Sequence, residues 1–89
     1  MTLLQTLSID IARINRELDA LAALSSSPPP GVTRVLWSEH DMAARALLRG
    51  WCAEAGLVVR EDALGNLFAR WPGEEPDLPP VASGSHTDA

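Results

Sequence analysis

Residues 81–89 read VASGSHTDA, a short run suited to a β-strand that ends in a histidine and an aspartate two positions apart. Alternate residues of a strand lie on the same side, so His86 and Asp88 would point the same way. An imidazole can bind a metal, and a nearby carboxylate can bind it too or orient the histidine. Ligands of open α/β sheets gather at the carboxyl ends of strands. The stretch therefore predicts a strand over 81–86 that leads into a metal site. The alternative, an incidental surface pair, stays open on these residues alone.

The first part of the chain predicts an amphipathic helix over about residues 2–24. A start at Ser8 as N-cap, with Asp10 near the positive helix end, is the alternative. The stripe indicates a helix packed on a sheet or on another helix, because too few heptads are present for a coiled coil. Apolar residues recur at spacings of three and four at Leu4, Leu7, Ile11, Ile14, Leu18 and Leu21.

A proline-rich linker over residues 25–31 follows, and three successive prolines favour an extended or polyproline-like path. A proline-rich recognition ligand is the alternative. Residues 32–37 are predicted to be extended or a loop, in which Arg34 and Trp37 pack or pair locally.

A second helix is predicted over about residues 39–55. Ser38 and Asp41 have the spacing of a capping box, with aspartate in place of the usual Glu or Gln. His40, in the first turn, is interpreted as exposed or as part of the cap. Cys52 is interpreted as a small core residue, because no base is near it in sequence.

Two strands are predicted over about residues 57–62 and 66–71, joined by turn-forming residues 63–66. An acidic, proline-containing loop then precedes the strand at 81–86. The expected fold is of the α/β class, with the element order α-α-β-β-β.

The composition narrows the function classes. Twelve acidic residues face seven basic ones, for a net charge of −5, and the basic residues form no cluster. Nucleic-acid binding needs a basic stripe, so it is not expected. No apolar run reaches the roughly 20 residues of a membrane span, and no signal peptide is recognised. A lone cysteine forms no internal disulfide, which favours a reducing, cytoplasmic setting.

Several motifs follow one another in a distinctive order over roughly residues 31–88. They are Gly31-Val32-Thr33-Arg34, Asp41-Met42-Ala43-Ala44-Arg45, Trp51 with Glu54-Ala55-Gly56-Leu57, Asp62-x-x-Gly65-Asn66-Leu67-Phe68 and Gly84-Ser85-His86-x-Asp88. In this order they resemble one family, the zinc-dependent hydantoinase/carbamoylase amidases. This family includes N-carbamoyl-L-amino-acid hydrolases, allantoate amidohydrolases and β-ureidopropionases.

The resemblance implies the N-terminal part of a dinuclear-metallopeptidase-like catalytic domain. His86 would be a ligand to one of two zinc ions (manganese, cobalt or nickel serve some members), and Asp88 would support His86. Two such ions, about 3.5–4 Å apart, activate a water and polarise the scissile carbonyl. The substrate would be a small carbamoyl or ureido compound, and the longer protein a homodimer.

The resemblance gives residues 62, 65 and 66 a role in shaping the hairpin and no catalytic role. The family's other metal ligands lie downstream, so we expect residues 1–89 to be an N-terminal fragment without activity of its own. The alternatives are a related metallopeptidase or aminoacylase, and a non-catalytic truncated chain.

Overall fold

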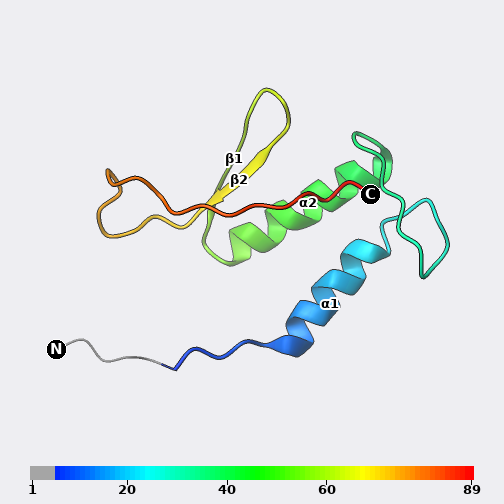
Figure 1. Ribbon diagram of the computed structural model, residues 1–89, viewed down its shortest axis with the longest axis horizontal. Helices are drawn as coiled ribbons and strands as arrows, with labels where there is room; N and C mark the ends of the chain where they lie inside the picture. The colour runs from blue at the N-terminus through cyan, green and yellow to red at the C-terminus, as the bar shows by residue number, and fades with distance from the viewer. Residues whose placement is uncertain (1–5) are drawn as a thin grey trace.

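The computed structural model describes residues 6–89 and contains two helices and a β-hairpin. In chain order these are α1 (Ile11–Ala22), α2 (Glu39–Glu54), β1 (Val58–Glu61) and β2 (Leu67–Arg70) (Figure 1). The predicted α/β class is confirmed. None of the helices among residues 6–89 is long and apolar enough to cross a bilayer.

Helix α1 begins later than predicted, because Asp10 and not Ser8 is its N-cap. The Asp10 carboxylate accepts a hydrogen bond from the Arg13 backbone N–H at 3.0 Å, which satisfies one of the free donors of the first turn. Residues 6–9 are not helical, and the predicted start at residues 2–5, with Leu4, lies outside the described residues.

The apolar stripe of α1 is exposed in this chain. Ile11 and Leu18 are 68% and 58% accessible, and no residue of the helix is buried. The predicted packing of this face on a sheet or helix is not seen within residues 6–89.

Residues 25–33 form a closed loop and not the predicted extended linker. The Thr33 backbone N–H donates to Ser25 Oγ at 2.8 Å, and the Thr33 carbonyl accepts from the Ser26 N–H at 2.9 Å. These short-range bonds override the extended preference of the prolines between them.

Helix α2 begins as its sequence predicts. Ser38 Oγ accepts from the Asp41 N–H at 3.2 Å, and Glu39 and Asp41 place negative charge in the first turn, where the helix dipole favours it. The helix ends beside Gly56, whose φ of 76° suits glycine. Cys52 is only half-buried.

Strands β1 and β2 form the predicted hairpin, with each strand shorter than expected. They pair antiparallel from Val58 opposite Arg70 to Glu61 opposite Leu67. The Arg60 guanidinium lies over the Phe68 ring, 4.0 Å from its centroid. Strand β1 lies against α2.

The predicted third strand at residues 81–86 is wrong. The segment returns past the hairpin to the loop between the helices (Figure 1), but its residues are assigned to no strand. Only at Ala89 does it form a backbone pair, in which the Ala89 N–H donates to the Arg34 carbonyl at 2.9 Å and the Arg34 N–H donates back at 2.6 Å. A strand needs a neighbour along its length, and the residue types of 81–86 cannot provide one.

The molecule is thin, with extents of 53 × 34 × 19 Å. Among the side chains of residues 6–89, only those of Ala44, Arg34 and Asp41 are buried. Polar contacts therefore fix the site more than an apolar core does.

Candidate metal centre

His86 and Asp88 come together as the sequence predicts, although no strand carries them. His86 Nδ1 lies 3.0 Å from the Asp88 carbonyl oxygen and 3.2 Å from Asp88 Oδ1. Both oxygens are acceptors, so in the neutral ring Nδ1 carries the proton and donates. The lone pair of Nε2 is then available to a ligand. Both side chains are exposed, at 81% for His86 and 53% for Asp88.

A cavity of about 390 Å³ lies beside this pair. One wall is the segment that carries His86 and Asp88, and another is the turn between β1 and β2. The floor comes from α2 and from Leu36, two residues before its N-cap Ser38. The lining residues are Leu36, Arg45, Leu48, Leu64, Gly65, Asn66, Leu67, Ser85, His86, Thr87 and Asp88.

The turn wall is fixed by Asp62, as the sequence suggests. Asp62 Oδ1 accepts the backbone N–H groups of Leu64 and Asn66 at 3.0 and 2.8 Å, and Oδ2 accepts the Asn66 side-chain amide at 2.9 Å. The Asn66 side-chain and backbone donors lower the pKa of the Asp62 carboxyl. The role of Asp62 is structural, and it lies outside the cavity lining.

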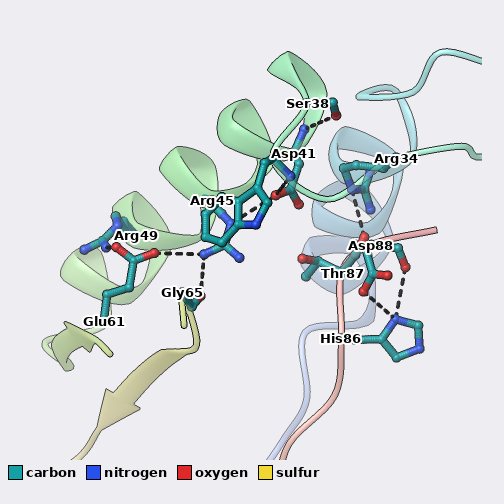
Figure 2. A network of polar contacts seen from close by, with 11 residues as sticks. Arg34, Ser38, Asp41, Arg45, Arg49, Glu61, Gly65, His86, Thr87 and Asp88 are labelled. Carbon is teal, nitrogen blue, oxygen red and sulfur yellow. Dashed lines mark hydrogen bonds and ion pairs between the residues drawn. The ribbon is translucent and has the colours of Figure 1, made fainter. Parts of the chain in front are cut away.

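A polar network attaches the turn to α2, and Arg45 is its centre (Figure 2). Arg45 Nε donates to Asp41 Oδ2 at 3.1 Å. Arg45 Nη1 donates to the Gly65 carbonyl at 2.6 Å and to Glu61 Oε1 at 2.9 Å. Arg49 Nη2 donates to Glu61 Oε2 at 3.0 Å. The network makes the position of the turn wall depend on charges from α2.

Trp37 is held in an unusual backbone conformation between the network and the turn. Its φ is 67°, in the left-handed region that large side chains rarely adopt. Its backbone N–H donates to Asp41 Oδ2 at 2.9 Å, and the Arg45 guanidinium lies 4.4 Å from the centre of its ring. The ring lies so close to Gly65 that a Cβ there would overlap it, and Gly65 also has a φ of 89°. The turn therefore requires glycine at this position.

Arg34 makes long-range contacts, so the expectation that it pairs locally is wrong. Its Nε donates to the Thr87 carbonyl at 2.9 Å, and its Nη1 donates to the carbonyls of Leu21 and Leu24 at 2.7 and 2.8 Å. The side chain is 94% buried, since Arg34 is 6% accessible. It therefore joins the C-terminal end of α1 to the segment that carries the His86–Asp88 pair (Figure 2).

The described residues fit one metal ligand and its supporting carboxylate, not a complete site. Among residues 6–89, no three His, Cys, Asp or Glu side chains are grouped closely enough to hold an ion. His40 is half-buried in the first turn of α2 and does not line the cavity. His86, with a free Nε2 and an anchored Nδ1, has the chemistry of a ligand.

Arg34 is the residue whose importance sequence reasoning missed. Its partner Thr87 is 53 positions away, and no periodicity reports a contact at that separation. The one available signal was the place of Arg34 at the end of the Gly31-Val32-Thr33-Arg34 motif.

Comparison with known proteins gives the same family as the motifs. No family model matches the chain. It is 47% identical over 89 residues to ureidoglycolate hydrolase of Arabidopsis thaliana, covering 100% of the chain and 19% of the relative. It is 37% identical over 86 residues to N-carbamoyl-L-amino-acid amidohydrolase of a Pseudomonas strain, covering 97% and 21%. It is 35% identical over 75 residues to allantoate amidohydrolase of Escherichia coli, covering 84% and 18%.

Solved structures agree in fold. A crystal structure of AtUAH in complex with glyoxylate superposes with a TM-score of 0.90 at 49% identity, covering 93% of this chain and 20% of that one. A hydantoinase/carbamoylase family amidase from Burkholderia ambifaria superposes with a TM-score of 0.87 at 42% identity, covering 94% and 21%. The chain spans about a fifth of the length of these relatives. By sequence and by fold, the chain therefore belongs to the hydantoinase/carbamoylase amidases and represents part of such a protein.

Proposed function

We propose that the chain contributes to a metal-dependent amidohydrolase that cleaves linear C–N bonds of N-carbamoyl amino acids or ureido compounds. The observation that carries this proposal is the His86–Asp88 pair beside the cavity, with Nδ1 held by Asp88 and Nε2 free. The names of the relatives support the substrate class, since they hydrolyse ureidoglycolate, N-carbamoyl-L-amino acids and allantoate.

His86 is the proposed metal ligand, through Nε2, and Asp88 is the carboxylate that orients it. A carboxylate that accepts the second ring N–H fixes the tautomer and raises the basicity of the ligand. Zinc suits an imidazole ligand, and Mn²⁺, Co²⁺ or Ni²⁺ are alternatives. The proposed pair of ions, when bound, would activate water and polarise the substrate carbonyl.

The chain alone is proposed to be inactive. A catalytic zinc ion usually has about three protein ligands, and residues 6–89 offer His86 and its helper. The remaining ligands, and a homodimeric assembly in the cytoplasm, are assigned to the longer protein. Its partners would be small ureido or carbamoyl molecules, not nucleic acids or membranes.

A related metallopeptidase or aminoacylase is the second candidate, since it would use the same pair of residues. The relatives' names favour the first candidate, because those compared act on carbamoyl or ureido compounds.

The test is a chimera in which residues 1–89 replace the matching segment of the Arabidopsis ureidoglycolate hydrolase. We expect it to hydrolyse ureidoglycolate and to contain metal, and we expect His86→Ala to lose both properties. His40→Ala is the matched control, because His40 lies outside the cavity lining. The 89-residue chain assayed alone should show no turnover. Full metal content and activity in a folded His86→Ala chimera would refute the proposal.

A further inference from the structure

We propose that Arg34 is a positioning residue, which holds His86 in the tautomer whose Nε2 is free to bind a metal. It acts through the main chain at Thr87, the residue between His86 and Asp88. This inference rests on the proposed metal role of His86 and deepens it. Arg34 touches neither of the two side chains, so its action is indirect.

The guanidinium divides its donors between two parts of the fold. Nη1 donates to the carbonyls of Leu21 and Leu24 near the end of α1, and Nε donates to the carbonyl of Thr87. The Leu21 carbonyl belongs to the last turn of α1 and Leu24 lies two residues beyond the helix. A buried cation at the C-terminal end of a helix is favoured by the helix dipole. The α1 contacts therefore hold the guanidinium in place, and its planar geometry directs Nε toward Thr87.

The main chain around Thr87 is fixed at few points. The Arg34 side chain binds the Thr87 carbonyl, and the Arg34 backbone pairs with Ala89 at 2.6 and 2.9 Å. These contacts lie on the two sides of Asp88. Among residues 6–89, the His86 ring has hydrogen-bond partners only on Asp88. Within the described part of the chain, no other side chain forms a hydrogen bond with the His86 ring.

The tautomer of His86 follows from this arrangement. Nδ1 meets the Asp88 carbonyl oxygen as well as its carboxylate, and it can do so only if residues 86–88 keep their present backbone path. A neutral histidine without such acceptors favours the proton on Nε2, which blocks the nitrogen proposed to bind metal. Releasing Thr87 therefore converts His86 from a ready ligand into one that must first change tautomer.

The test is ¹⁵N NMR of the imidazole in the full 89-residue chain, at a pH well above the ordinary histidine pKa of about 6.5. A His40→Gln background leaves His86 as the sole histidine. Arg34→Lys removes the Nε donor to Thr87, while its ammonium can still approach the α1 carbonyls. Arg70→Lys is the matched control, because Arg70 Nη2 donates to the Pro76 carbonyl at 2.9 Å, away from the cavity.

We expect mainly the Nδ1–H form in the wild-type chain and in Arg70→Lys. We expect loss of that form, with Nε2–H dominant, in Arg34→Lys at unchanged helicity by circular dichroism. A wild-type chain with Nε2–H dominant, or a helical Arg34→Lys chain that keeps Nδ1–H, overturns the proposal.

If Arg34→Lys loses helicity, a second variant tests the proposal. In it, an ester replaces the amide between Thr87 and Asp88, and the chain is made by ligation at Cys52. It weakens the Thr87 carbonyl as an acceptor and removes no side chain. A shift to Nε2–H supports the proposal, and an unchanged tautomer overturns it.

The metal content of the chimera separates this inference from the proposed function. If the tautomer depends on Arg34 but a folded His86→Ala chimera keeps its full metal content, the metal role fails and the positioning role stands. If the His86→Ala chimera loses metal and the tautomer is independent of Arg34, the positioning role alone is refuted.

Discussion

Replacing Asp41 by alanine is expected to destabilise the chain by about 2–3 kcal/mol. Asp41 is fully buried, and its Oδ2 accepts from the Trp37 backbone N–H and from Arg45 Nε. Hydrogen bonds to a charged group contribute about 1.5–3 kcal/mol each, so the two lost bonds cost about 3–6 kcal/mol. The other oxygen, Oδ1, is buried without a partner. Removing it recovers about 1–3 kcal/mol, because an unpaired buried acceptor is unfavourable.

The predicted loss is large compared with the stability available. A chain of 89 residues at about 0.05 kcal/mol per residue has about 4 kcal/mol in total. This value is the low end of the usual range of about 0.05–0.15 kcal/mol per residue. It applies here because Ala44 is the one buried apolar side chain among residues 6–89. Asp41→Ala should therefore lose about half to three quarters of the free energy of unfolding.

Urea denaturation followed by tryptophan fluorescence and by circular dichroism measures this loss. Glu39→Ala is the matched control, since Glu39 lies exposed in the same helical turn and should change stability by no more than about 0.5 kcal/mol. Equal stability of Asp41→Ala and the wild-type chain would refute the reasoning. It would mean that the unpaired Oδ1 costs as much as the two bonds of Oδ2 provide.

Gly65→Ala should lower the free energy of unfolding by about 2–4 kcal/mol, because the backbone there is left-handed and the new Cβ would overlap the Trp37 ring. Gly73→Ala is the control in the same denaturation assay, because the space around Gly73 is open. Asp62 has a lowered pKa in the folded chain, so its stabilising effect is complete above the unfolded carboxyl pKa of about 3.9 and is lost as the pH falls through the lower folded value. NMR of the Asn66 amides should report this loss, and Asp62→Asn should remove the pH dependence; an unchanged titration would contradict the assignment. Asp88→Asn in the chimera should weaken metal affinity about 10–100-fold, measured by chelator competition, and unchanged affinity would remove Asp88 from the site.

The parts of the fold that depend on neighbours in sequence were predictable. The Ser38 cap reads correctly because its partner, the Asp41 N–H, is three residues away. The hairpin reads correctly because Asp62 bonds within its own turn. Helix α1 was placed too early because an apolar periodicity continues through residues that do not form helix, while the cap at Asp10 depends on a single hydrogen bond.

The parts that depend on distant partners were not predictable. The residue types at 81–86 suggest a strand, but within residues 6–89 the segment has no neighbour to pair with until Ala89 meets Arg34. The contact between His86 and Asp88 was predicted although the strand was not formed, because a histidine and an acid two apart can meet in more than one backbone conformation. Arg34 binds the backbone between them at Thr87, 53 residues away in sequence, and this contact could not be predicted.

Helix α1 has both a feature that the sequence predicts and a long-range contact that it does not predict. Its stripe was read from sequence, yet Ile11, Ile14 and Leu18 remain 43–68% exposed. The end of the same helix provides the Leu21 and Leu24 carbonyls that hold Arg34, and Arg34 holds Thr87. Any surface that covers the stripe would therefore also restrain the His86 segment, because the guanidinium links the two. Mutations on the exposed face of α1 should affect His86 through Arg34, although they lie outside the cavity.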